Sequence, residues 1–165
     1  MESEEHSDRT SAEAGSGIAV EPGAQPGPET VVIQVPADAD YLPVIRSASA
    51  HVATKLGCTL AEVADLRLAV DEACGLLLRH TVRDSDGDGD EHGADGVAAG
   101  DLVCRFILDG PALRVVLSRR ARNAAPPQSD EFGWTILSAL VDDILWRVDG
   151  PTVHVEILKR RAAGR

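Results

Sequence analysis

The sequence predicts an α+β fold, a two-layer sandwich in which a mixed β-sheet is covered on one face by helices. Three observations support this class. Short aliphatic stretches alternate with segments of helical periodicity in the order β-α-α-β-β-α-β-β. The later aliphatic stretches form two hairpins, each closed by an Asp-Gly-Pro turn. Hydrophobic residues make up 44% of the 165 residues, which is enough for the core of one domain, although aromatic residues are only 3%.

Residues 31–57 predict a strand followed by a helix. Residues 31–35 are mostly β-branched and predict a short strand. Asp38 or Asp40 can cap a helix that runs to about Leu56, and Gly57 ends that helix.

A long second helix follows, from a capping box at Thr59 and Glu62 to about Val82. Apolar residues recur along it at spacings of four, three and four, which predicts one continuous buried face. These residues are Leu66, Val70, Ala73 and Leu77.

The second half of the sequence predicts two β-hairpins with a third helix between them along the chain. Ser129 or Asp130 is the predicted N-cap of that helix. In chain order the segments are a strand at 102–108, a strand at 112–117, a loop at 118–129, a helix to about Ile144, and strands at 145–148 and 153–158.

The net charge of −11 is concentrated in two segments. Residues 1–29 hold seven acidic residues and one arginine, and residues 84–101 hold seven acidic residues and no basic one. We expect a disordered acidic tail at 1–29, a domain at 30–160 that contains an acidic loop insertion, and a basic tail at 161–165. The nearly neutral remainder has no basic patch with interleaved aromatics, which argues against direct nucleic-acid binding.

The three cysteines, Cys58, Cys74 and Cys104, are far apart in apolar surroundings and predict free, buried thiols. No apolar run approaches the roughly 18 residues of a membrane span, and the N-terminus lacks a signal-peptide pattern. We therefore expect a soluble, cytoplasmic protein without membrane contact.

Residues 84–95 partly match a calcium-binding EF-hand loop. Glu91 occupies the usual apolar anchor position, and a predicted strand follows where an exiting helix is required. A flexible acidic insertion is the favoured interpretation, with weak calcium binding as the alternative. His92 and His154 have no partners at metal-ligand spacing, so no metal site is predicted.

Two segments carry a family resemblance: residues 64–74, which end in Val-Asp-Glu-Ala-Cys, and residues 132–144, which begin Phe-Gly-Trp. With them, residues 30–160 resemble the RsbW/SpoIIAB group of bacterial anti-sigma factors, and in particular its actinobacterial branch. These proteins are serine kinases of the GHKL (histidine-kinase-like, Bergerat-type) ATPase fold. The resemblance implies that fold, with ATP and Mg²⁺ as cofactors.

In that group one helix carries Glu-x-x-x-Asn, with the Glu as general base and the Asn as Mg²⁺ ligand. The resemblance makes Glu72 the catalytic base and a nucleotide-site residue. The Asn position is Leu76, which has no oxygen for a hard cation. The alternative for Glu72 is a solvent-facing helix residue near Arg67 or Arg79.

The other two nucleotide motifs are also altered. The family's Asp-x-Gly-x-Gly corresponds to residues 117–123, which contain neither Asp nor Gly, and Gly133 alone remains of the glycine-rich lid. Arg119, Arg120 and Arg122 can still attract phosphates. We therefore expect ATP and Mg²⁺ binding to be weakened, with Arg119, Arg120 and Gly133 as remaining cofactor-site residues.

The resemblance also implies partners. These are an alternative sigma factor of the stress or sporulation type, an anti-anti-sigma (STAS-type) protein and a second copy in a homodimer. Arg46 matches an arginine of the family's sigma-binding helix; the alternative is an ordinary solvated charge. The functional prediction is an anti-sigma factor with a degenerate nucleotide site, and the alternative is an active serine/threonine kinase that phosphorylates the antagonist.

Overall fold

The computed structural model describes residues 27–81, 97, 100–121 and 124–161. Three predictions therefore lie wholly or mostly outside the described residues: the disordered tail, the acidic insertion with its EF-hand-like loop, and the basic tail.

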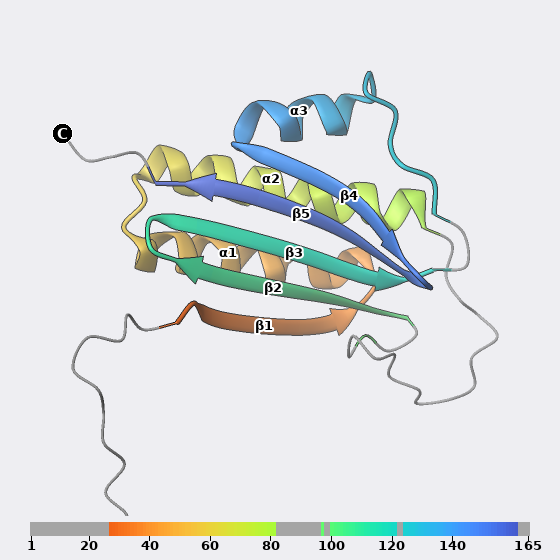
Figure 1. Ribbon diagram of the computed structural model, residues 1–165, viewed down its shortest axis with the longest axis horizontal. Helices are drawn as coiled ribbons and strands as arrows, with labels where there is room; N and C mark the ends of the chain where they lie inside the picture. Colours follow the sequence, from red (N-terminus) through yellow and green to blue (C-terminus); the bar gives the residue numbers. More distant parts are fainter. Residues whose placement is uncertain (1–26, 82–96, 98–99, 122–123, 162–165) are drawn as a thin grey trace, which may run out of the picture.

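The described residues form one five-stranded sheet and three α-helices, with a short 3-10 helix before the first (Figure 1). The strand order is β1-β2-β3-β5-β4. In chain order the elements are β1 (Glu29–Pro36), η1 (Ala39–Tyr41), α1 (Leu42–Leu56), α2 (Leu60–His80), β2 (Asp101–Asp109), β3 (Ala112–Arg120), α3 (Phe132–Leu140), β4 (Asp143–Asp149) and β5 (Thr152–Arg160).

The α+β sandwich is confirmed, but the sheet is antiparallel between all described neighbours rather than mixed. Two successive helices separate β1 from β2, so the chain returns in the opposite direction. Strands β3 and β4 do run parallel, because both are antiparallel to β5. They are not neighbours, since the β4–β5 hairpin places β5 between them.

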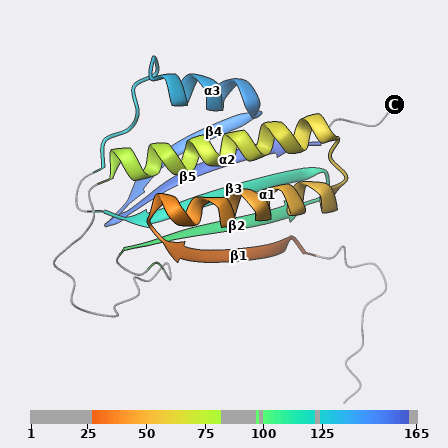
Figure 2. The same ribbon diagram turned by 180° about the vertical axis from the view of Figure 1, so that it is seen from behind.

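The turn between the first two helices forms as predicted, but the first helix does not start as predicted. Asp38 caps the 3-10 helix η1, and α1 has Tyr41 as its N-cap residue without a side-chain cap. Thr59 and Glu62 form a capping box at the start of α2. Gly57 ends α1 in the left-handed region, at φ 83°, where a side chain is disfavoured. These local contacts fix the turn between α1 and α2, and the two helices lie side by side on the sheet (Figure 2).

The region after the first hairpin differs from the prediction. Strand β3 continues to Arg120, because Ser118 to Arg120 pair with β5. Helix α3 has Glu131 as its N-cap residue rather than Ser129 or Asp130. It ends at Leu140 rather than near Ile144, because Ile144 is paired with Ile157 in the sheet. Apolar residues continue at helical spacing beyond Leu140, but pairing with β5 places Ile144 in a strand instead.

The core lies between the sheet and the helices, which all cover the same face (Figure 2). Its members are aliphatic with one buried aromatic ring, Phe106. Cys74 and Cys104 are buried free thiols, as predicted, whereas the free thiol of Cys58 is only half-buried. Burial and, to a smaller extent, the nearby carboxylate of Asp71 together raise the pKa of Cys74 to about 12.

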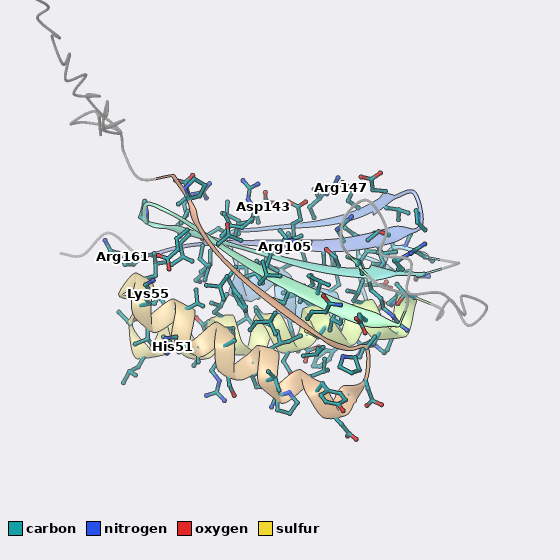
Figure 3. All side chains as sticks on the ribbon, turned by 90° about the horizontal axis from the view of Figure 1, so that it is seen from below. His51, Lys55, Arg105, Asp143, Arg147 and Arg161 are labelled. Atoms are coloured by element: carbon teal, nitrogen blue, oxygen red, sulfur yellow. The ribbon has the colours of Figure 1, made fainter. Side chains whose placement is uncertain are left out.

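The other face of the sheet carries charged side chains. Asp143 and Arg147 point away from the helices there, whereas His51 and Lys55 lie on α1 (Figure 3). Within the described part of the chain, no helix is both long and apolar enough to cross a membrane.

Candidate functional site

The predicted catalytic residue lies on the face of α2 that packs against α3. Glu72, Leu76, Arg79 and His80 recur at helical spacing and so share one side of the helix. Glu72 is half-buried, Leu76 is fully buried and Arg79 is exposed. Glu72 is therefore at a helix–helix contact, which we call the α2–α3 seam, rather than on an open helix surface.

Gly133 brings the first turn of α3 into direct contact with this face. A Cβ atom at Gly133 would lie 3.1 Å from Glu72 Oε2, 3.1 Å from Arg79 Nη2 and 3.4 Å from Leu76 Cδ2. These distances are at or below the usual limit for a Cβ contact, so the glycine permits the close approach. The structure thus brings two predicted site residues, Glu72 and Gly133, together.

Polar and charged side chains hold the start of α3 to the end of α2. The Nε2 atom of His80 and the Oε2 atom of Glu131 lie 2.7 Å apart, which is hydrogen-bond distance. Arg79 Nη2 lies 3.7 Å from the other carboxylate oxygen of Glu131. The His80 ring also meets Trp146 of β4 edge to face, with ring centroids 6.1 Å apart.

Arg119 and Arg120 lie at the end of β3, close to the end of α2. Arg119 is 5% exposed. Its Nη1 donates to Thr81 Oγ1 at 2.7 Å and to the Thr81 carbonyl at 3.3 Å. These contacts give Arg119 a structural role at the C-terminal end of α2, where carbonyls need donors. Arg120 is half-buried. The phosphate contact proposed for both arginines stays a prediction.

The family resemblance implies a magnesium ion, so the residues of the α2–α3 seam can be checked for side chains able to bind it. Leu76, at the position of the metal ligand, is 0% exposed and offers no oxygen. Within the described residues, no group of three or more His, Cys, Asp or Glu side chains could hold a metal ion. Leu76 therefore does not fit the magnesium role, whereas Glu72 remains a carboxylate at the expected position.

Arg46, the predicted partner-binding residue, lies on α1 and pairs with Asp71 of α2. Its Nε and Nη2 atoms donate to Asp71 Oδ1 at 3.0 and 2.6 Å. The two side chains are 38% and 33% exposed. A shallow cavity of about 250 Å³ beside them is also lined by Ala64, Arg67 and Leu68. Arg46 is therefore fixed by Asp71 at the edge of a surface cavity.

The sequence prediction did not identify His80 and Glu131 as parts of the seam. One signal was available, since residues 79 and 80 continue the helical face that begins with Glu72 and Leu76. The role of Glu131 had no comparable signal, because its contact with α2 depends on where the tertiary fold places α3.

The profile of the histidine kinase-like ATPase domain family matches residues 35–157. The chain is 26% identical over 90 residues to the serine-protein kinase RsbW of Bacillus pumilus (strain SAFR-032), which covers 54% of this chain and 49% of that protein. It is 30% identical over 60 residues to the serine-protein kinase RsbW of Bacillus thuringiensis (strain Al Hakam), which covers 36% of this chain and 38% of that protein. The chain thus spans half or less of these relatives.

A solved structure shares the fold. The RsbU and RsbW domains of Rv1364c from Mycobacterium tuberculosis match with a TM-score of 0.56 at 16% identity, over 81% of this chain and 32% of that one. The family match covers most of the chain, including α1, α2, α3 and strands β2, β3 and β4. The chain therefore belongs to the family of histidine kinase-like ATPase domains, and within that family it is similar to RsbW-type proteins.

Proposed function

We propose that this chain is an anti-sigma regulatory factor. It binds an alternative sigma factor by direct protein contact, and an anti-anti-sigma protein of the STAS type releases that sigma factor. The similarity to RsbW proteins supports this role, and the observation that carries it is the placement of Arg46. The proposed setting is the cytoplasm, with the chain as a homodimer.

The geometry of Arg46 suits recognition of a carboxylate. Asp71 uses the Nε–Nη2 edge of the guanidinium, and Nη1 takes no part in that pair. A guanidinium can donate two parallel hydrogen bonds to a second carboxylate through Nη1 and Nη2. The neighbouring cavity, with Leu68 45% exposed, adds an apolar contact. An acidic and apolar segment of a sigma factor matches this combination.

The test is a binding measurement with candidate alternative sigma factors of the stress or sporulation type from the source organism. We expect Arg46→Ala to weaken binding about tenfold, the loss of one charge-assisted contact. Lys55→Ala is the matched control, because Lys55 also pairs with an acidic residue, Glu29, but near the far end of α1. Equal effects of both variants, or no binding by the wild type, would contradict the proposal.

We further propose that the nucleotide site is degenerate and that ATP and Mg²⁺ bind weakly. Leu76 supplies no metal ligand, and the end of β3 carries arginines where the family motif has Asp and Gly. Glu72 and Gly133 are the nucleotide-site positions that this chain keeps. Release of the sigma factor then depends on competition between proteins rather than on phosphotransfer.

An active serine/threonine kinase is the second candidate. It is favoured by Glu72, which keeps the carboxylate of a general base next to Gly133 at the seam, and by the names of the relatives. Incubation with labelled ATP, Mg²⁺ and a STAS-type protein separates the two. Phosphate transfer that is lost in Glu72→Gln supports the kinase, and no transfer under conditions where the STAS protein displaces sigma supports the regulator.

A further inference from the structure

Glu131 occupies the N-cap position of α3, but its side chain does not cap that helix. N-cap side chains usually accept a hydrogen bond from the second or third amide of their own helix. The side chain of Glu131 makes no such bond and instead reaches the last turn of α2. Its Oε2 meets His80 and its Oε1 faces Arg79, so both carboxylate oxygens are directed to basic side chains of another helix.

Two glycines, one on each helix, make room for the Arg79 side chain. A Cβ atom at Gly75 would lie 2.9 Å from Arg79 Nη1, and one at Gly133 would lie 3.1 Å from Arg79 Nη2. The guanidinium thus lies across both backbones. A permanent positive charge is held at the seam, next to the position where Leu76 provides no metal ligand.

Two further contacts hold the same region. The His80 ring packs against Trp146, which connects the end of α2 to β4. Thr81 forms a β-bridge with Ala124, in the segment that leads from β3 to α3. The chain on both sides of α3 is therefore tied to the C-terminal end of α2.

We propose that Arg79, His80 and Glu131, which we call the α2–α3 latch, fix α3 against α2 without a nucleotide. The latch holds the two helices through contacts within the chain, namely the His80–Glu131 hydrogen bond and the nearby Arg79 charge. This inference rests on the proposed function in one respect, since it takes the seam as the degenerate nucleotide site.

Hydrogen exchange of the full chain tests the latch. We expect the α3 amides of the wild type to be protected without nucleotide, and added ATP with Mg²⁺ to leave their exchange unchanged. Glu131→Gln should speed exchange of residues 132–140 roughly tenfold, with the sheet amides unaffected. Asp130→Asn removes the same charge one residue earlier and should have no effect, since Asp130 is exposed.

His80→Phe is the second variant, because it keeps a ring against Trp146 and removes the hydrogen bond to Glu131. It should also speed α3 exchange, and since residue 80 is not part of α3, an altered cap cannot explain that result. Slower α3 exchange on adding ATP and Mg²⁺ to the wild type would overturn the latch, as would unchanged exchange in both variants. Sigma binding by Arg46→Ala is measured in a separate experiment, so the sigma-binding proposal and the latch proposal can each fail without the other.

Discussion

The two sides of helix α2 use similar charged residues, yet they are built differently. On the α1 side, Arg46 and Asp71 pair at 2.6 Å with side chains 38% and 33% exposed, beside a cavity of about 250 Å³. On the α3 side, His80 and Glu131 pair at 2.7 Å with side chains 24% and 25% exposed, next to a glycine contact. Packing rather than residue type thus makes one side an open surface and the other a closed seam.

The largest effect is expected from placing asparagine in the seam. Leu76→Asn introduces the residue type that the resemblance to RsbW proteins implies for a metal ligand, but Leu76 is 0% exposed. Loss of apolar burial and burial of an amide should lower the free energy of unfolding by about 3 kcal/mol. Leu68→Asn, on the open side of the same helix and 45% exposed, should cost less than about 1 kcal/mol in urea denaturation. Equal costs would remove the distinction between the two sides.

A side chain at Gly133 should disrupt the seam by overpacking. Gly133→Val introduces methyl groups where a Cβ already lies 3.1 Å from Glu72 and Arg79 atoms, at an expected cost of about 2 kcal/mol in unfolding free energy. Gly27→Val is the control, because a Cβ at Gly27 meets no atom within 4 Å. An unchanged denaturation midpoint for Gly133→Val would show that the seam is looser than described.

A smaller effect is expected where the seam end of α2 meets β3. Thr81→Val removes the hydroxyl that accepts from buried Arg119, and we expect a loss of about 1.5 kcal/mol in unfolding free energy. Thr54→Val is matched, because Thr54 donates to the carbonyl four residues earlier, as Thr81 does, but is exposed and bonds no arginine in the described structure. A thermal denaturation series that ranks Thr54→Val as the more costly change would contradict this role for Arg119.

The smallest effect belongs to the open side. A double-mutant cycle of Arg46→Ala and Asp71→Ala should give a coupling of about 0.5 kcal/mol in unfolding free energy. The coupling is small because solvent screens this pair, whose side chains are 38% and 33% exposed. The same cycle for His80→Phe and Glu131→Gln should give a larger coupling. A reversed order would mean that the open pair, and not the seam, stabilises the fold.

The fold was largely predictable because its local signals are strong. The capping box at Thr59, the left-handed Gly57 and the two Asp-Gly-Pro turns each act within a few residues, so each could be identified from the sequence. The end of α3 could not be predicted in this way. Ile144 continues the helical apolar pattern, but its pairing with Ile157 is a contact between strands.

The candidate site was predictable only in part. Glu72 and Leu76 could be assigned from their spacing on one helix, together with the resemblance to RsbW proteins. The partners of Arg46 and Arg119 could not, since Asp71 and Thr81 lie 25 and 38 residues away in the sequence. Such pairs become neighbours only when helices and strands pack.

The sequence by itself determined the order of the elements, the α+β class and the positions of Glu72 and Leu76 on one helical face. Periodicity, caps and turns are properties of neighbouring residues, so they are encoded locally. The tertiary structure alone decided that the sheet is antiparallel, that Glu131 binds α2 rather than capping α3, and that Gly133 closes the seam. These features depend on contacts between distant segments, which form only when the core excludes water and brings the elements together.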